Sequence, residues 1–209
     1  MKPVCLVLGA GAGIGGTVAA KFASEGYHSC LCRRSDQEGL DRLVKGIEDE
    51  GGSANGYLIN AIEDNVIEDL INTIESDVGP IEVVVYNLGA QTGMKLLKDT
   101  THKEFEWGWR MASLGLFRVA KMLCPIMKER GKGTILVTSA TAAMRGNATQ
   151  HSHAAAMGAR RMLCQSLNAE FAISGIHVAH IVIDGAVDAP DTLGKMLGPE
   201  MFQKFRETK

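Results

Sequence analysis

The sequence lacks the charge pattern that would indicate a polyanionic partner. Among its 209 residues, 22 Lys and Arg are balanced by 24 Asp and Glu, so the formal net charge is only -2. No long run of charge of one sign occurs. Proteins that bind nucleic acid usually carry a clustered basic surface. The charge balance therefore argues against nucleic acid as a partner.

Long hydrophobic runs, internal repeats and low-complexity segments are also missing. The apolar stretch in MKPVCLVLGAGAGIGG passes into glycines after a few residues. It is too short for the hydrophobic region of a signal peptide and far too short to span a membrane. These absences predict a cytoplasmic protein with no membrane partner. Without a linker rich in Pro or Ser, residues 1–209 are expected to form a single domain.

Cysteines are few and have no paired spacing of the kind that binds metals. Cys30 and Cys32 alternate along one apolar run, which is typical of small buried side chains in a reducing compartment. His151 and His153 are two residues apart, which is poor spacing on a helix for a shared metal. We therefore expect neither disulfides nor a metal site among the five cysteines, Cys5, Cys30, Cys32, Cys124 and Cys164.

Apolar runs alternate strictly with segments of helical periodicity. The runs rich in β-branched residues are 3–9, 27–33, 53–59, 81–87, 133–139 and 176–183. The helical segments between them are 13–25, 36–50, 63–77, 101–130 and 150–173. This alternation predicts an α/β fold, a doubly wound parallel sheet of the Rossmann type with helices on both faces.

A glycine-rich segment follows the first predicted strand. Glycines there permit positive φ angles in the turn and a close approach of backbone amides to a pyrophosphate. Glycines also make ordinary turns, but this segment ends a strand and opens a helix, which favours dinucleotide binding. The expected contacts are Gly9, Ala12, Gly13, Ile14 and Gly15.

Basic residues stand where a domain that selects NAD usually carries an acid, about 20 residues beyond the glycine loop. The second predicted strand ends in Cys32, Arg33 and Arg34. Two guanidinium groups can bind a 2′-phosphate through paired hydrogen bonds, so NADP is favoured over NAD. The alternative is a solvated Arg pair at the start of a helix.

Taken together, these features resemble the classical short-chain dehydrogenase/reductase superfamily along essentially the whole chain. The family's TGxxxGxG loop is matched at Gly9, Gly13 and Gly15, and its NNAG turn is matched in part by Asn87 and Gly89. The resemblance implies an oxidoreductase that transfers hydride between NADP(H) and a small-molecule carbonyl or secondary alcohol.

The resemblance also implies further cofactor contacts. The segment GIHVAHIVIDGAV keeps the family's glycine as Gly185, and Asn60 stands where an acidic residue usually contacts adenine. Family members continue to a seventh strand, but no strand-like run follows Ile183. The C-terminal strand is thus expected to be missing, either by truncation or because the domain has dispensed with it.

The family's catalytic residues are largely replaced. Ser113 stands at the position of the family's Asn in the fourth crossover helix. Ser139 is the expected counterpart of the catalytic Ser, although a shift of one residue puts Ala140 there. Both Ser113 and Ser139 are therefore candidate catalytic residues.

The segment QHSHAAAMGARRM has neither the Tyr nor the Lys of the family's YxxxK pair. The best register puts His153 at the Tyr position and Met157 at the Lys position, whereas a shift of one residue gives Ser152 and Ala156. Residues four apart share one face of a helix, so the pair should face one cleft.

Of the two replacements, only His153 can move a proton. Met157 offers no cationic donor to a ribose. An imidazole, with an unperturbed pKa of about 6.5, can transfer a proton at neutral pH without a neighbouring cation, unlike a phenol at about 10. His153 is therefore a candidate acid. The competing hypotheses are a dinucleotide-binding sensor or assembly subunit without turnover, and a structural relic that binds no cofactor.

Residue type predicts the surroundings of two further groups of side chains. Arg160 and Arg161 are expected to be solvated or paired with carboxylates. The aromatic residues of the fourth crossover are expected in the core or at a subunit contact. Family members usually form a subunit interface with the fourth and fifth crossover helices. The resemblance thus implies a homo-oligomer, a dimer or tetramer, through a region containing Phe105, Trp107, Trp109 and Phe117.

Overall fold

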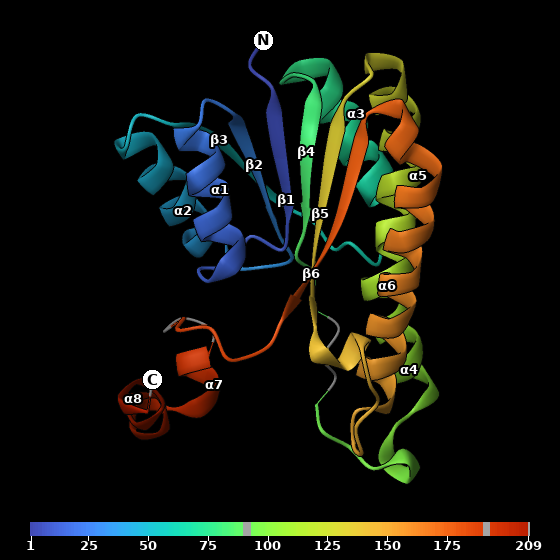
Figure 1. The fold of residues 1–209 in the computed structure, drawn as a ribbon. Helices are drawn as coiled ribbons and strands as arrows, with labels where there is room; N and C mark the ends of the chain where they lie inside the picture. The colour runs from blue at the N-terminus through green and yellow to red at the C-terminus, as the bar shows by residue number, and fades with distance from the viewer. Residues whose placement is uncertain (90–92, 190–192, 209) are drawn as a thin grey trace.

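The computed structural model describes residues 1–89, 93–189 and 193–208, and it contains one parallel sheet with six strands. The strand order is β3-β2-β1-β4-β5-β6, so the chain starts in the middle of the sheet and winds outward on both sides (Figure 1). This confirms the doubly wound α/β fold. The strands are β1 (Val4–Leu8), β2 (His28–Arg33), β3 (Ser53–Leu58), β4 (Ile81–Tyr86), β5 (Gly133–Ala140) and β6 (Ile176–Ile183).

Helices lie on both faces of the sheet. Figure 1 shows α1 and α2 on one face and α3, α5 and α6 on the other, with the C-terminal helices beyond the carboxyl ends of the strands. The helices are α1 (Ile14–Ser24), α2 (Gln37–Asp49), α3 (Val66–Asp77), α4 (His102–Trp109), α5 (Gly115–Arg130), α6 (His151–Phe171), α7 (Lys195–Leu197) and α8 (Pro199–Glu207).

Alternate strand residues pack into two separate apolar layers. Leu6, Cys30 and Val84 belong to the layer against α3 and α5, whereas Cys5 and Leu31 belong to the layer against α1 and α2. Because both faces are covered, β1 and β4 read as nearly continuous apolar runs rather than as alternating patterns. The five cysteines are buried, and burial raises the pKa of the Cys30 thiol to about 12.

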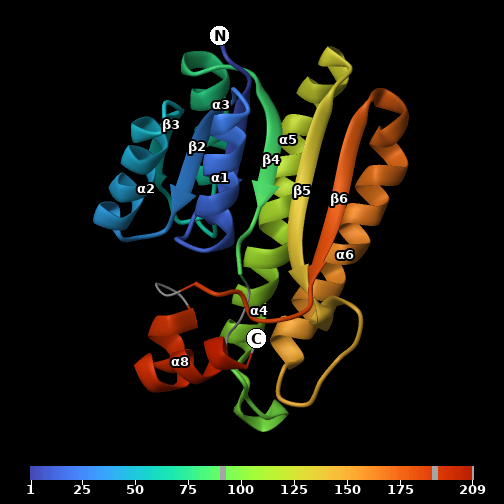
Figure 2. The same ribbon diagram turned by 60° about the vertical axis from the view of Figure 1, so that its left-hand side comes forward.

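Among the described residues, helices cover only one face of the half of the sheet formed by β5 and β6. α6 packs on one side, and Figure 2 shows the other side of these strands with no helix in front of it. Ile181 is exposed on β6. No strand follows β6 within the described ranges, so β6 is an edge strand whose outer ladder groups pair with no other described strand.

The single helix expected over residues 101–130 is interrupted by a π-helical turn at Arg110–Leu114, which joins α4 to α5. Such a turn changes the hydrogen-bonding pattern of the helix and occurs often at functional sites. Two carbonyls of this turn accept hydrogen bonds from side chains on β4 and α6. The donors are Tyr86, which bonds the Met111 carbonyl, and Arg160, which bonds the Ala112 carbonyl. Helical periodicity alone does not reveal these tertiary partners.

Candidate cofactor and active site

Four hollows follow the carboxyl edge of the sheet, and we refer to this row of hollows as the groove. We name them the basic hollow, the Asn60 hollow, the glycine-loop hollow and the His153 hollow. Neighbouring hollows share lining residues, since Arg33 joins the first two, Gly9 joins the next two, and Ile14 and Asn87 join the last two. In open α/β sheets, ligands bind in this crevice outside the carboxyl ends of the strands.

The glycine-loop hollow is lined by Gly9, Gly11, Gly13, Ile14 and Gly15 among others. Gly9 has φ +95°, and a Cβ there would lie 2.6 Å from the Asn87 carbonyl oxygen. A Cβ on Gly15 would lie 2.3 Å from the Gly9 carbonyl oxygen. Larger residues therefore do not fit at these two positions. α1 starts here without a side-chain cap or an acidic residue in its first turn, which suits the binding of a phosphate anion.

Asn87 fixes the floor of the groove. Its Nδ2 donates to the Gly9 carbonyl at 2.9 Å, and its Oδ1 accepts from the Thr138 hydroxyl at 2.7 Å. The side chain thus ties the glycine loop to β5 from the end of β4. The predicted cofactor contacts Gly89 and Gly185 line the His153 hollow beside it.

The Asn60 hollow contains the other residues predicted at the end of the second and third strands. Arg33, Arg34 and Asn60 all line it. The Asn60 side-chain amide donates to the Glu63 carboxylate at 2.8 Å, which fixes its orientation. The fold thus brings Arg33, Arg34 and Asn60 to one hollow, although Arg34 does not line the basic hollow.

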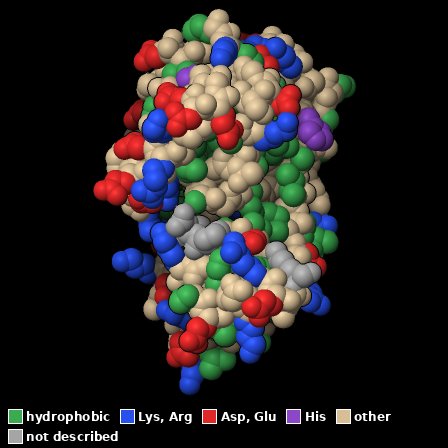
Figure 3. Space-filling view, turned by 90° about the vertical axis from the view of Figure 1, so that its left-hand side faces the viewer, with side chains coloured by type: hydrophobic (Ala, Val, Ile, Leu, Met, Phe, Trp, Pro, Cys, Tyr) green, Lys and Arg blue, Asp and Glu red, His purple; other side chains and the backbone are tan. Residues whose placement is uncertain are grey.

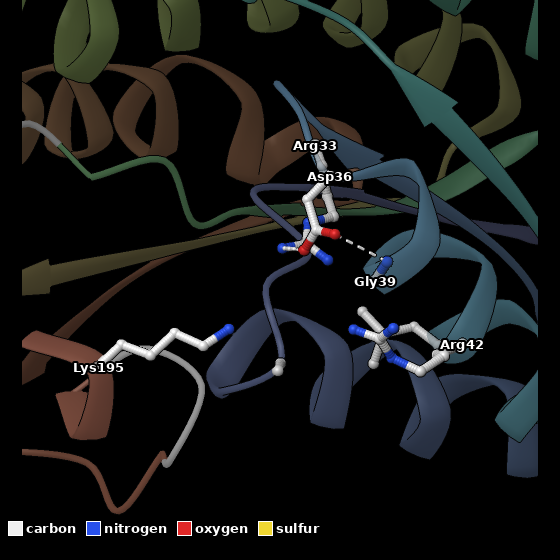
Figure 4. Close-up of a pocket in the computed structure, with 7 residues that line it drawn as sticks. Arg33, Asp36, Gly39, Arg42 and Lys195 are labelled. Carbon is white, nitrogen blue, oxygen red and sulfur yellow. Dashed lines mark hydrogen bonds and ion pairs between the residues drawn. The ribbon is translucent and has the colours of Figure 1, made fainter. Parts of the chain in front are cut away.

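The basic hollow lies between the end of β2, the start of α2 and the C-terminal helices. Its side chains include Arg33, Asp36, Arg42 and Lys195, and Ala12 of the glycine loop also lines it (Figure 4). Figure 3 shows Lys and Arg side chains gathered at mid-height on this side of the molecule. No sequence motif indicated Lys195, which lies beyond β6. Arg42 lies one helical turn past Gly39, so helical spacing could have suggested that both residues face the same hollow.

Asp36 is held in place by several neighbours. Its carboxylate accepts the Gly39 backbone N–H at 2.9 Å and pairs with Arg33 at 2.8 Å. The hydrogen bond from Gly39, followed by the charges of Arg33, Arg42 and Lys195, holds the pKa of Asp36 below its usual range. A Cβ on Gly39 would lie 2.2 Å from the Asp36 Oδ2, so a glycine is needed for this approach.

The His153 hollow has a volume of about 270 Å³ and lies between β4, β5 and the first turns of α6. His153 and Met157 both line it. In the alternative register, Ser152 and Ala156 are 3% and 2% exposed and line none of the four hollows. Ser152 instead donates its hydroxyl proton to the Glu104 carbonyl at 3.0 Å. The helix thus presents His153 and Met157 to the cavity.

The two predicted catalytic serines have different surroundings. Ser139 lines the His153 hollow, as does Ala140, and the Ser139 hydroxyl lies 3.6 Å from the Met157 sulfur. Ser113 is buried, and its hydroxyl donates to the Ala156 carbonyl at 3.2 Å. Ser113 lines none of the four hollows, so the fold brings Ser139 and His153 together without it.

Arg160 is buried rather than solvated and pairs with no carboxylate among the described residues, which corrects the sequence-based expectation for this residue. It is 1% exposed, lies 5.1 Å above the Tyr86 ring and forms part of the wall of the His153 hollow. Burial lowers its pKa, while the guanidinium remains charged. Its three donor nitrogens bond the carbonyls of Ala112, Thr138 and Leu88 at 3.0, 2.9 and 2.7 Å.

The position of Arg160 follows from helical geometry. It lies three residues beyond Met157 and seven beyond His153, so all three occupy one face of α6. Within the described parts of the chain, no carboxylate lies at ion-pair distance from it. A positive charge is therefore built into the wall of the hollow, although the family's Lys position holds Met157.

Comparison with known proteins agrees with this geometry. A family model described as short chain dehydrogenase matches residues 3–193. The chain belongs to the short-chain dehydrogenase family. It is thus a member of an oxidoreductase family, and the family resemblance found from the motifs is confirmed.

Related short-chain dehydrogenases cover most of the chain at low identity. A 3-oxoacyl-[acyl-carrier-protein] reductase of Thermotoga maritima is 28% identical over 207 residues, which are 98% of this chain and 80% of that protein. The crystal structure of a short-chain dehydrogenase from Rhodopseudomonas palustris is 31% identical, with a TM-score of 0.80 over 88% of this chain and 84% of that chain.

Solved structures with a similar fold include complexes with NADP. A gluconate 5-dehydrogenase from Burkholderia cenocepacia, in complex with NADP and tartrate, is 27% identical, with a TM-score of 0.79 over 87% of this chain and 71% of that chain. NADP is therefore bound by a protein with a fold like this one. In the part of the chain that the structure describes, no helix is both long and apolar enough to cross a membrane.

Proposed function

We propose that this chain transfers hydride between NADP(H) and a carbonyl or secondary alcohol. The observation that carries the proposal is the row of hollows along the carboxyl edge of the sheet, with cationic side chains lining the hollow at one end and both Ser139 and His153 lining the hollow at the other. An elongated dinucleotide with a phosphate at its adenosine end suits a groove with this distribution of charge.

The residues of the groove fit the parts of this cofactor. Gly9 and Gly15 leave room for a pyrophosphate at the uncapped start of α1. Arg33 and Arg34 would hold the adenosine end, with Arg42 added by the fold, and Asn60 would border the adenine. NADP(H), when bound, supplies or accepts the hydride.

The residues of the chain itself must transfer one proton and hold the substrate oxygen by a hydrogen bond. His153 would donate a proton to the substrate oxygen during reduction and accept it during oxidation. The Ser139 hydroxyl would hydrogen-bond the same oxygen once it turns from the Met157 sulfur, to which it now points. Proton transfer by a well-placed side chain contributes about 10² to 10⁴ in rate.

Calorimetry and single-turnover kinetics test this proposal together. The wild-type chain should bind NADPH more tightly than NADH and should oxidise bound NADPH with at least one ketone of a panel. His153→Phe should lower that single-turnover rate by about 10² or more without changing the NADPH affinity. His151→Phe is the matched control, because His151 lies on the same helix and does not line the His153 hollow. An unchanged rate in His153→Phe would remove His153 from the mechanism.

A second candidate function is dinucleotide binding without turnover, as in a sensor or assembly subunit. It is favoured by Met157, whose apolar side chain lines the hollow where the family's Lys would bind the ribose. NADPH binding at micromolar concentration, with no ketone reduced in a single turnover, would select this function. No binding at millimolar NADPH would exclude both candidates and leave a structural relic.

We also propose that the chain forms a homo-oligomer, a dimer or tetramer, through the fourth and fifth crossover helices, which are α4, α5 and α6. Phe105, Trp109 and Phe117 on these helices are between 43% and 48% exposed. Exposed aromatic side chains are typical of subunit contacts. Sedimentation should detect a dimer or tetramer that Trp109→Glu dissociates, whereas Ile173→Glu at a distant exposed site should not. A monomeric wild type would refute the proposal.

A further inference from the structure

Strands β4 and β5 stop pairing with each other at the edge of the groove. Among the described residues, their ladder ends at Tyr86 and Val137, although β5 continues to Ala140. A buried backbone carbonyl beyond the end of a ladder needs a donor from another part of the protein. The carbonyls of Leu88 and Thr138 have such a donor, and in both cases it is the guanidinium of α6 described above.

Arg160 bridges the two strand ends from the side of α6. Its Nη2 donates to the Leu88 carbonyl at 2.7 Å, and its Nη1 donates to the Thr138 carbonyl at 2.9 Å. Nε donates to the Ala112 carbonyl of the π-helical turn at 3.0 Å. A guanidinium is planar and holds its donors in a fixed arrangement, so the three bonds fix the three carbonyls relative to one another. Arg160 therefore sets the spacing between the ends of β4 and β5.

Each of the two strand-end carbonyls belongs to a peptide group that precedes a residue of the His153 hollow. The Thr138 carbonyl is in the peptide that leads into Ser139, and the Leu88 carbonyl is in the peptide that leads into Gly89. A peptide group is planar, so fixing its carbonyl also fixes the direction in which the next residue starts. Ser139 and Gly89 both line the hollow. The guanidinium thus acts on the hollow through the backbone.

A second bridge between the same strand ends connects to a different part of the groove. The Asn87 side chain accepts from the Thr138 hydroxyl at 2.7 Å and donates to the Gly9 carbonyl at 2.9 Å. Asn87 thereby ties the strand ends to the glycine loop, whereas Arg160 ties them to α6 and the π-helical turn. Of the four hollows, Arg160 lines only the His153 hollow. A change at Arg160 should therefore affect this end of the groove and leave the adenosine end as it is.

We propose that Arg160 positions Ser139 and the Leu88–Gly89 peptide in the part of the groove that would hold the nicotinamide and the substrate oxygen. The inference rests on the proposed NADP(H) function and adds to it a positioning residue that acts through the backbone. A lysine at this position keeps the charge, but its single nitrogen cannot bond all three carbonyls in the same arrangement. Arg160→Lys should therefore disturb the nicotinamide end of the groove although a positive charge is still present.

The first test compares dissociation constants for NADPH and 2′,5′-ADP in the wild type, Arg160→Lys and Arg161→Lys. Arg161 is the matched control, because it is the next residue of α6, is partly exposed and lines none of the four hollows. Arg160→Lys should weaken NADPH binding about tenfold, the effect of one lost hydrogen bond to the cofactor, and should leave 2′,5′-ADP binding unchanged. Arg161→Lys should change neither. Equal weakening of both ligands in Arg160→Lys would show a general loss of structure and overturn the proposal.

A double-mutant cycle measures whether Arg160 acts through Ser139. Arg160→Lys and Ser139→Ala should each lower the single-turnover rate of ketone reduction by bound NADPH, the former by about 10², as for a small misplacement of a reacting group. The double variant should be about as slow as the slower single variant, because residues that act as a unit are not additive. Ile74→Val, which removes one methylene from the buried core on α3, is the control for lost stability and should keep the wild-type rate. Effects that multiply in the double variant would overturn the link to Ser139.

The possible results separate this inference from the proposed function. Unchanged NADPH affinity and an unchanged rate in Arg160→Lys would overturn the role of Arg160 while leaving hydride transfer intact. NADPH affinity that depends on Arg160, in a protein that reduces no ketone, would support the positioning role and refute hydride transfer. A wild type that binds no NADPH at millimolar concentration would refute both. If Arg160→Lys does not fold, Arg160→Gln, which places no charge in the core, takes its place with the same expected results.

Discussion

Replacing His153 by Tyr together with Met157 by Lys should raise kcat/KM for ketone reduction by about 10² to 10⁴. Both side chains line the same hollow on one face of α6, and Ser139 borders it. A Tyr would supply an acidic group on a side chain as long as the one that family members use. A Lys would bind the ribose and lower the Tyr pKa through its charge. Steady-state kinetics with NADPH and the ketone that the wild type reduces would measure the gain.

A single replacement separates ribose binding from proton transfer. Met157→Lys alone should tighten NADPH binding more than it raises turnover, because the cation contacts the ribose while His153 remains the acid. Met162→Lys adds a cation at an exposed position of the same helix and should change neither quantity. A double variant that folds and binds NADPH but is no faster than the wild type would show that the geometry of the hollow, rather than the missing pair, limits catalysis.

Replacing Arg160 by Met should lower the free energy of unfolding by about 3 kcal/mol. The guanidinium satisfies three backbone carbonyls, and a buried polar group without a partner costs roughly 1–3 kcal/mol. Removal of a buried charge offsets part of that loss, since its desolvation is unfavourable by several kcal/mol. The loss exceeds the gain because three carbonyls lose their donor at once, whereas only one charge is removed. Urea unfolding would measure the change.

Two further variants identify the cause of that loss. Arg161→Met, at the adjacent and partly exposed position, should change stability by about 0.5 kcal/mol or less. Arg160→Lys keeps the charge but not the planar fork that reaches several carbonyls at once, so it should recover only part of the stability. If Arg160→Met is as stable as the wild type, the three hydrogen bonds contribute no net stability.

Short sequence motifs predicted the parts of the groove that come from short continuous segments of the chain. The glycine loop needs small residues at fixed offsets after a strand, and the structure shows the reason in the contacts that a Cβ would make at Gly9 and Gly15. Arg33 and Asn87 were found because each directly ends or follows a predicted strand, and parallel strands end at one edge of the sheet.

The sequence alone determined the doubly wound α/β fold class, the family and the composition of the glycine loop, because apolar periodicity and local turn geometry depend on neighbouring residues. Only the tertiary structure decided which helix residues face the cavity, where the long helix forms a π turn, and how Arg160 and Lys195 reach the groove. Those features depend on contacts between residues far apart in the chain, such as Arg160 with Leu88. The Arg160 charge can be buried only where carbonyls accept its hydrogen bonds, and those carbonyls come together only when the sheet and α6 pack.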